Sequence, residues 1–127
     1  MEWIRQRSDR DCGLCVVAML TDLPYERALA DNPEYENTTD QRWIDYIRAL
    51  GFRIRRTRLL NRGYRHFAIV DIADGIPTNS HAIAIDEMGN VFDPSTRAPA
   101  PGTLEVSWYR TPPRNLSFVH VLGRKKS

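Results

Sequence analysis

The stretch Asp11–Leu20, DCGLCVVAML, decides which fold this chain of 127 residues can adopt. From Cys12 onward it is apolar, and its side chains are small or of medium size. Such a stretch suits a buried helix that packs closely against a sheet. Asp11 or Asp9 is a plausible N-cap. We therefore expect a buried helix that begins at Cys12.

Two more helices are expected before residue 51. Pro24 opens the segment PYERALADN, and proline favours the first turn of a helix. Thr39 or Asp40 can cap the segment QRWIDYIRAL, whose apolar residues recur at helical spacing. Gly51 then provides a natural stop for that third helix.

After Gly51 the apolar residues alternate with polar ones, which is the pattern of half-buried strands. Six segments show it: FRIRRTRLL (52–60), HFAIVDIA (66–73), SHAIAIDE (80–87), NVFDP (90–94), LEVSWYR (104–110) and LSFVHVLG (116–123). Within them, IAIDEMGNVFD is typical of a hairpin. Helices followed by antiparallel strands indicate an α+β fold. The sequence contains no linker or repeat, so we expect a single domain over residues 1–127.

Composition narrows the function classes. Apolar residues make up 42% of the chain and charged residues 27%, an ordinary composition for a soluble protein. No run approaches the roughly 18 apolar residues of a membrane span, and the first residues lack the apolar region of a signal peptide. We expect a cytoplasmic protein with both cysteines reduced and with no cofactor. A net charge of +2 is too mild to indicate nucleic-acid binding.

A local cluster of positive charge stands out against that balance. Arg53, Arg55, Arg56 and Arg58 lie within one predicted strand. The simplest interpretation is that they form its solvent-exposed face. The alternative is a stripe that attracts an acidic protein partner.

The two cysteines form the spacing C-x-x-C, which has three interpretations. A redox pair is expected after a strand in a βαβ unit, and residues 1–11 carry no strong strand signal. A structural zinc site needs four ligands, usually from two paired motifs, and no second C-x-x-C exists. The third interpretation, a thiol nucleophile at a helix start, makes demands that the sequence meets.

A nucleophilic thiol needs a lowered pKa, which a helix N-terminus and an imidazolium both provide. Cys12 stands at the expected helix start, and Gly13 would let a substrate approach its sulfur. His81 opens an apolar strand and is the expected general base. Asp93 ends the next strand, where the hairpin brings it back toward His81 to orient the ring. Gln6, six residues before Cys12, is a candidate oxyanion donor.

Rival residues exist for two of these roles. His66 also opens an apolar strand, and His120 alternates within the last strand, so either is a possible base. Asp86 is the rival of Asp93, although its place in the hairpin turn is sufficient to explain it.

The ordered set Gln6, Asp11-Cys12-Gly13, His81 and Asp93-Pro94 resembles the papain-like cysteine peptidases. It is most similar to the bacterial branch that removes double-glycine leader peptides from bacteriocin precursors, and to its small stand-alone relatives. The resemblance covers roughly residues 3 to 95. It implies a helical half that carries the cysteine, packed against an antiparallel sheet that carries the histidine and aspartate.

By position, the resemblance implies Cys12 as nucleophile, His81 as general base and acid, Asp93 as the group that orients the imidazole, and Gln6 as an oxyanion donor. Cys15 stands where this family has a small buried residue, so the resemblance implies that it belongs to the core. We therefore expect a cysteine hydrolase that cleaves a peptide or isopeptide-type amide of a protein substrate. Two alternatives remain open. The same site could transfer the acyl group to an amine, or the domain could be a non-catalytic module that binds a partner through the strand from Arg53 to Arg58.

Overall fold

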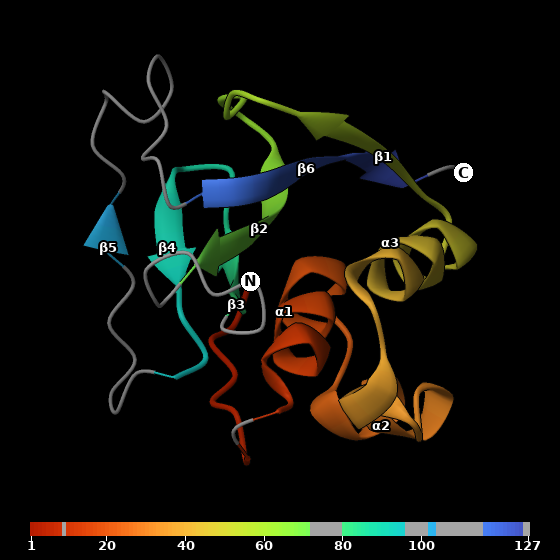
Figure 1. Ribbon diagram of the computed structural model, residues 1–127. Coiled ribbons are helices and arrows are strands. Elements are labelled where there is room, and N and C mark those ends of the chain that lie inside the picture. Colours follow the sequence, from red (N-terminus) through yellow and green to blue (C-terminus); the bar gives the residue numbers. More distant parts are fainter. Residues whose placement is uncertain (9, 72–79, 96–101, 104–115, 126–127) are drawn as a thin grey trace.

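The computed structural model describes residues 1–8, 10–71, 80–95, 102–103 and 116–125, which form an α+β fold (Figure 1). The helices are α1 (Cys12–Thr21), α2 (Tyr25–Asp31) and α3 (Asp40–Ala49), with a 3-10 turn, η1 (Tyr35–Asn37). The strands are β1 (Phe52–Thr57), β2 (Arg65–Asp71), β3 (Ser80–Ile85), β4 (Asn90–Phe92), β5 (Gly102–Thr103) and β6 (Leu116–Lys125). The expected strand at 104–110 lies outside the described residues.

Within the described ranges the strands form one antiparallel sheet in the order β1-β6-β2-β3-β4-β5. The last strand of the sequence, β6, is therefore inserted between β1 and β2. The predicted hairpin is confirmed: β3 and β4 pair directly, and the Asp86 backbone N–H donates to the Asn90 carbonyl at 3.0 Å. The alternation of apolar and polar residues predicts the individual strands. The position of β6 in the sheet depends on contacts between segments that are distant in the sequence.

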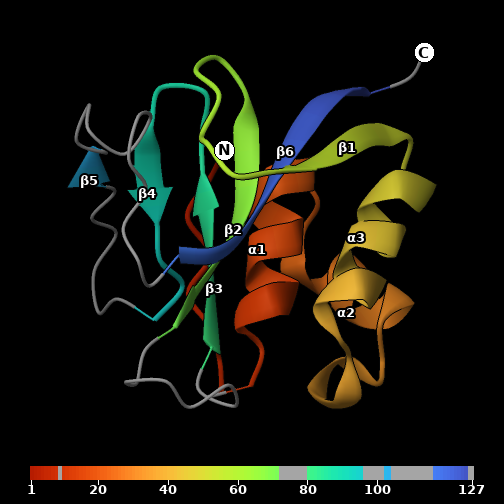
Figure 2. The same cartoon turned by 45° about the horizontal axis from the view of Figure 1, so that its top comes forward.

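Helix α1 is the centre of the core, as expected from its apolar sequence. Every residue from Gly13 to Thr21 is buried. The helix packs against one face of β2 and β3, which contribute Phe67, Ile69, Ala82 and Ala84 to the same core. Figure 2 shows α1 between the sheet and the other two helices. The small Ala82 and Ala84 side chains suit this close approach between helix and sheet.

The helix ends follow the sequence signals only in part. Thr39 caps α3 as expected, because its hydroxyl accepts the Arg42 backbone N–H at 3.4 Å. Asp11 occupies the N-cap position of α1, yet its side chain accepts no cap hydrogen bond. Of the two expected caps, Asp11 therefore has the N-cap position without the side-chain bond, and Asp9 lies outside the described residues. No helix in the described part of the chain is long and apolar enough to cross a membrane.

Gly13 has a packing role that the sequence did not indicate. A Cβ built at this position would meet the Trp43 indole Nε1 at 2.4 Å and Cε2 at 2.8 Å. Trp43 belongs to α3 and is buried in the core. The missing side chain at Gly13 therefore faces α3 and lets the indole pack on the first turn of α1. We expected the missing side chain at Gly13 to leave space for a substrate near the Cys12 sulfur. The Trp43 indole occupies that space instead.

Candidate functional site

The hairpin brings His81 and Asp93 together. The imidazole Nε2 of His81 and Oδ1 of Asp93 lie 2.6 Å apart. The β3–β4 register pairs Ala84 with Phe92 and Ile85 with Val91, so in the same register Asp93 faces Ile83. His81 and Asp93 are thus diagonal neighbours on one face, a separation that long side chains span. His81 is farther from the hairpin turn than Asp93, and the diagonal arrangement accounts for this difference.

Cys12 lies at the first residue of α1, next to the end of β3 that carries His81. The His81 side chain and the backbone N–H groups of Ala82 and Gly13 each lower the pKa of the Cys12 thiol. One of these N–H groups comes from the first turn of α1 and the other from β3. With Nε2 held by Asp93, the Nδ1 atom of His81 is the ring nitrogen left for the thiol. His81 is thus coupled both to the Asp93 carboxylate and to the Cys12 thiol.

The charged forms of Cys12, His81 and Asp93 stabilise one another. Burial raises the pKa of the Cys12 thiol, but His81 and the two backbone N–H groups outweigh it, so the pKa is lowered. Burial lowers the pKa of His81, but Asp93 and Cys12 raise it overall to about 9. Burial likewise raises the pKa of Asp93, and the bonds from His81 and Ser95 bring it down to about 2. Each shift favours the charged form of its group, which is the thiolate for Cys12, the imidazolium for His81 and the carboxylate for Asp93.

The Asp93 carboxylate has a further hydrogen-bond partner that the sequence analysis missed. Its Oδ1 atom accepts from the Ser95 backbone N–H at 2.9 Å and from the Ser95 hydroxyl at 2.7 Å. An aspartate that bonds the backbone two residues later is a common turn motif, so the sequence Asp-Pro-Ser held a usable signal. These bonds fix the carboxylate toward His81.

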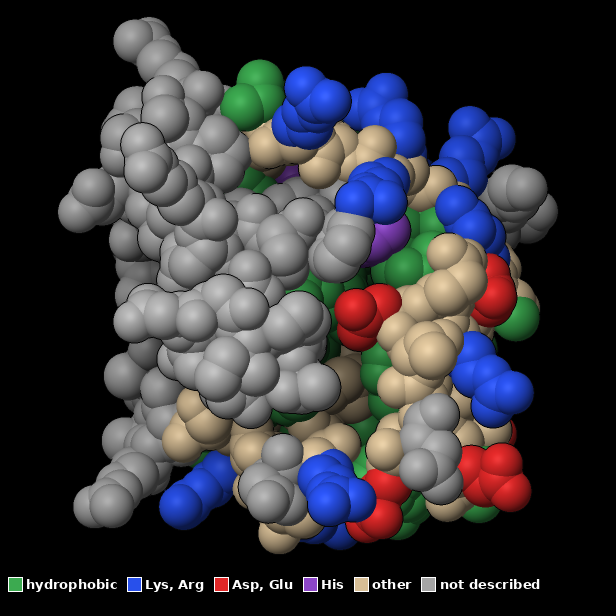
Figure 3. All heavy atoms as spheres, in the orientation of Figure 1, with side chains coloured by type: hydrophobic (Ala, Val, Ile, Leu, Met, Phe, Trp, Pro, Cys, Tyr) green, Lys and Arg blue, Asp and Glu red, His purple; other side chains and the backbone are tan. Residues whose placement is uncertain are grey.

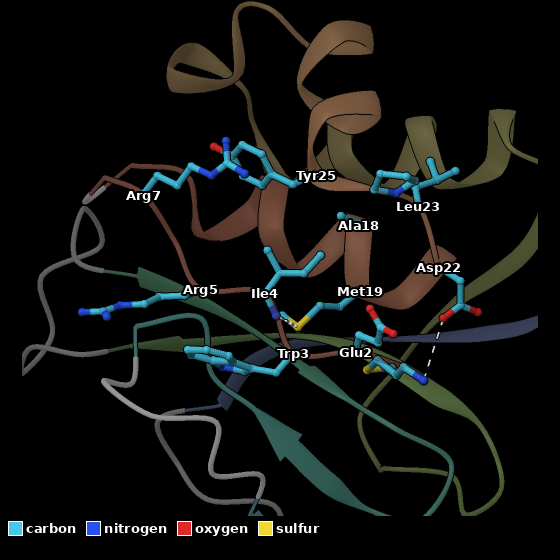
Figure 4. A pocket seen from close by; sticks show the side chains of 12 residues that line it. Glu2, Trp3, Ile4, Arg5, Arg7, Ala18, Met19, Asp22, Leu23 and Tyr25 are labelled. Carbon is cyan, nitrogen blue, oxygen red and sulfur yellow. Dashed lines mark hydrogen bonds and ion pairs between the residues drawn. The ribbon is translucent and has the colours of Figure 1, made fainter.

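The first residues of the chain are fastened to the strand end that carries Asp93. The Trp3 indole N–H donates to the Asp93 carbonyl at 2.9 Å, and the Gln6 backbone N–H donates to the Pro94 carbonyl at 2.9 Å. Figure 4 shows this segment beside α1, where the Ile4 backbone N–H meets the Met19 sulfur at 3.2 Å. No local sequence pattern indicated the Trp3 contact, because it joins residues 90 positions apart.

Gln6 lies beside Asp93-Pro94, and its side chain is held by the following loop. Its Nε2 atom donates to the Ser8 carbonyl at 2.6 Å, which leaves its second N–H unassigned. Its Oε1 atom is buried without a hydrogen-bond partner. The role of Gln6 as an oxyanion donor stays a prediction.

Asp11 organises the loop between Gln6 and Cys12. Its side chain is fully buried and accepts the backbone N–H groups of Arg7 at 2.9 Å and Ser8 at 3.1 Å, together with the Tyr25 hydroxyl at 2.8 Å. Burial raises the pKa of Asp11, but these bonds together lower it overall. The Arg7 guanidinium stacks on the Tyr25 ring at 3.8 Å, which Figure 4 shows at the outer end of the segment.

Cys15 is completely buried, which confirms the interpretation as a core residue. Burial raises the pKa of its thiol far above that of a free cysteine, and the Asp11 charge adds to this effect. The two cysteines of the C-x-x-C spacing are therefore chemically different. Only Cys12 is partly exposed and has a lowered pKa.

The rival residues lie elsewhere. His66 pairs with Ile85, at the opposite end of β3 from His81, and burial lowers its pKa to about 4. The rings of His120 and Phe67 form a T-shaped pair with 6.5 Å between their centroids. The Asp86 carboxylate accepts the Met88 and Asn90 backbone N–H groups at 3.0 and 2.8 Å, so it serves the hairpin turn.

Comparison of the sequence with protein families and with curated proteins does not assign this chain to a family. No protein-family model matches the chain, and no curated protein matches it either. Among the described residues no group of three or more His, Cys, Asp or Glu side chains is arranged to hold a metal ion. The function is therefore argued from the geometry around Cys12.

Proposed function

We propose that this protein is a cysteine hydrolase of papain-like type, which cleaves a peptide or isopeptide-type amide through an acyl-enzyme on Cys12. The observation that carries the proposal is the coupled set Cys12, His81 and Asp93, with a lowered thiol pKa and a raised imidazole pKa. A nucleophile, a base and a group that orients the base are the parts that such chemistry requires.

In the first half of the reaction, the Cys12 thiolate attacks the carbonyl carbon of the scissile amide. The carbonyl oxygen becomes an oxyanion, for which the Cys12 backbone N–H and the free N–H of Gln6 are the proposed donors. The His81 imidazolium gives its proton to the leaving nitrogen. The C–N bond breaks, an amine departs, and a thioester remains on Cys12.

In the second half, the neutral His81 ring takes a proton from water, and the hydroxide adds to the thioester carbonyl. The C–S bond breaks, a carboxylic acid leaves, and the thiolate–imidazolium pair is restored. Asp93 keeps Nε2 of the ring engaged throughout, so that Nδ1 faces the reacting atoms. If an amine replaces water in this step, the product is a new amide, which is the acyl-transfer alternative.

The test is a cleavage assay on a complex peptide library, with the new termini identified by mass spectrometry. Wild type should produce discrete cleavages that are lost in Cys12→Ala and in His81→Ala, while Asp86→Asn retains them as a matched control. Adding a primary amine separates hydrolysis from transfer by product mass. Cleavage that persists in purified Cys12→Ala would contradict the proposal.

A further inference from the structure

Strand β1 is an outer edge of the sheet. It pairs with β6 on one side, and in the described part of the chain no strand pairs with its other side (Figures 1 and 2). Every second residue of an edge strand directs its backbone N–H and C=O away from the sheet. One of these carbonyls, that of Ile54, meets the Arg48 side chain at a long 3.5 Å. Such a strand offers a template on which an extended peptide can add.

The same strand carries a concentration of positive charge. Arg53 and Arg55 are exposed, and so is Arg58 just after the strand. None of these three arginines has a carboxylate partner among the described residues. Figure 3 shows Lys and Arg side chains gathered along the upper right margin, over β1 and the end of β6. We call the outer edge of β1, with these three residues, the arginine edge.

A hollow lies beside the arginine edge. It has a volume of about 390 Å³ and is lined by Arg53, Ile54, Arg55, Asn61, Tyr64, Val121 and Gly123. Tyr64 is 47% exposed, so its ring is accessible from the hollow. Gly123 helps to form the hollow, because a Cβ at that position would meet the Arg53 Cβ at 3.2 Å. The hollow thus provides two guanidinium groups and an aromatic side chain next to an open backbone edge.

The other face of β1 has a different character. A second hollow there, of about 310 Å³, is lined by Asp40, Gln41, Ile44, Arg48, Arg56 and His120. The Asp40 carboxylate in this lining would oppose an acidic side chain on that face. The contacts of an acidic ligand are therefore assigned to the face of Arg53 and Arg55.

We infer that the arginine edge binds an acidic, extended segment of a partner protein by adding it as a strand beside β1. Arg53 and Arg55 are two residues apart, about 7 Å along the strand. Acidic residues at alternate positions of an added strand recur at the same distance and on the same face. Guanidinium groups form paired hydrogen bonds with carboxylates. The expected ligand therefore has the pattern acidic-x-acidic, with its backbone bonded to β1.

The inference is independent of catalysis at Cys12. In the sheet order, β1 lies three strands from β3, which is about 14 Å at the usual strand spacing. A bound segment would therefore leave the region of His81 uncovered. Charge on an edge strand also discourages aggregation, and this simpler role predicts no specific ligand. The two roles differ in a binding experiment.

The experiment measures fluorescence anisotropy of a labelled twelve-residue peptide in which Glu and Thr alternate. The protein carries Cys12→Ala, so that cleavage does not interfere. Arg53→Glu/Arg55→Glu should weaken binding at least about tenfold. The matched control is Arg5→Glu/Arg42→Glu, which makes the same charge change at exposed sites outside β1 and should leave the affinity within about twofold. Circular dichroism and urea unfolding verify that both double variants are folded.

A second peptide separates strand addition from general attraction between charges. It has the same sequence with alternate backbone nitrogens methylated, which keeps the carboxylates and removes half of the N–H donors. This peptide should bind at least about tenfold more weakly, and only the unmodified peptide should slow hydrogen exchange in β1. Equal binding of the two peptides, or unchanged binding by Arg53→Glu/Arg55→Glu, would overturn the inference. So would tighter binding of a twelve-nucleotide thymidine strand, which would assign the edge to nucleic acid.

Discussion

The reactivity of Cys12 toward iodoacetamide at pH 6 gives the most direct measure of the Cys12–His81–Asp93 set. A free cysteine with a pKa of about 8.5 is about 0.3% thiolate at that pH. Complete ionisation would therefore raise the alkylation rate at most about 300-fold. A thiolate of lower pKa is also a weaker nucleophile, so the largest gain that Cys12 can show is roughly 10- to 100-fold. Cys12 should show this excess over a free thiol, and the buried Cys15 should show none.

Two substitutions show how much of the increase in the Cys12 alkylation rate depends on His81 and how much depends on Asp93. His81→Ala removes the imidazolium, which is the strongest influence that lowers the Cys12 pKa, so the excess at pH 6 should fall at least about tenfold. Asp93→Asn should act in the same direction but less strongly. The reason is that Asp93 is the main group that raises the His81 pKa to about 9. Without its charge, the ring loses its proton at a lower pH, and the ion pair spans a narrower range.

The assay follows alkylation from pH 5 to 10, with tandem mass spectrometry to separate the two cysteines, because Cys12 and Cys15 share one tryptic peptide. Asp86→Asn is the matched control, since it neutralises a carboxylate in the same hairpin that bonds only the turn. Its rate at Cys12 should equal that of wild type. Equal rates at pH 6 for wild type and His81→Ala, in folded proteins, would refute the electrostatic coupling on which the proposed function rests.

Three predictions concern stability, each measured as the free energy of unfolding in urea. Gly13→Ala should lose about 1–3 kcal/mol, because the new Cβ would meet Trp43 at 2.4 Å; an unchanged value would mean that the indole moves freely. Asp11→Ala should lose more than about 2 kcal/mol, because it leaves two backbone N–H groups and the Tyr25 hydroxyl without their buried partner; a loss below 1 kcal/mol would contradict this. Asp93 has a pKa lowered from 3.8 to about 2, so its contribution is present above pH 4 and is lost as the pH falls toward 2. The difference between wild type and Asp93→Asn should therefore shrink by about 2 kcal/mol over that range, and a constant difference would argue against the shift.

The sequence by itself determined the local elements of this protein. The apolar run after Cys12 gave a helix buried all round, and the alternation after Gly51 gave the strands. The hairpin between His81 and Asp93 followed from turn residues at Met88-Gly89-Asn90. Each of these signals acts between residues close in sequence, where propensity and periodicity are informative. The candidate residues could be selected in the same way, because their order and types match the needs of thiol chemistry.

The tertiary structure alone decided how these parts meet. It set the diagonal register that joins His81 to Asp93, and it turned the Asp11 carboxylate from the expected cap toward the backbone N–H groups of Arg7 and Ser8. It also explains why residue 13 is a glycine, because the Trp43 indole fills the space that a side chain would need. Each of these outcomes depends on which side chain fills a given direction once distant segments have packed. Local propensity carries no information about that, because the free energy comes from burial and from hydrogen bonds that form only in the assembled core.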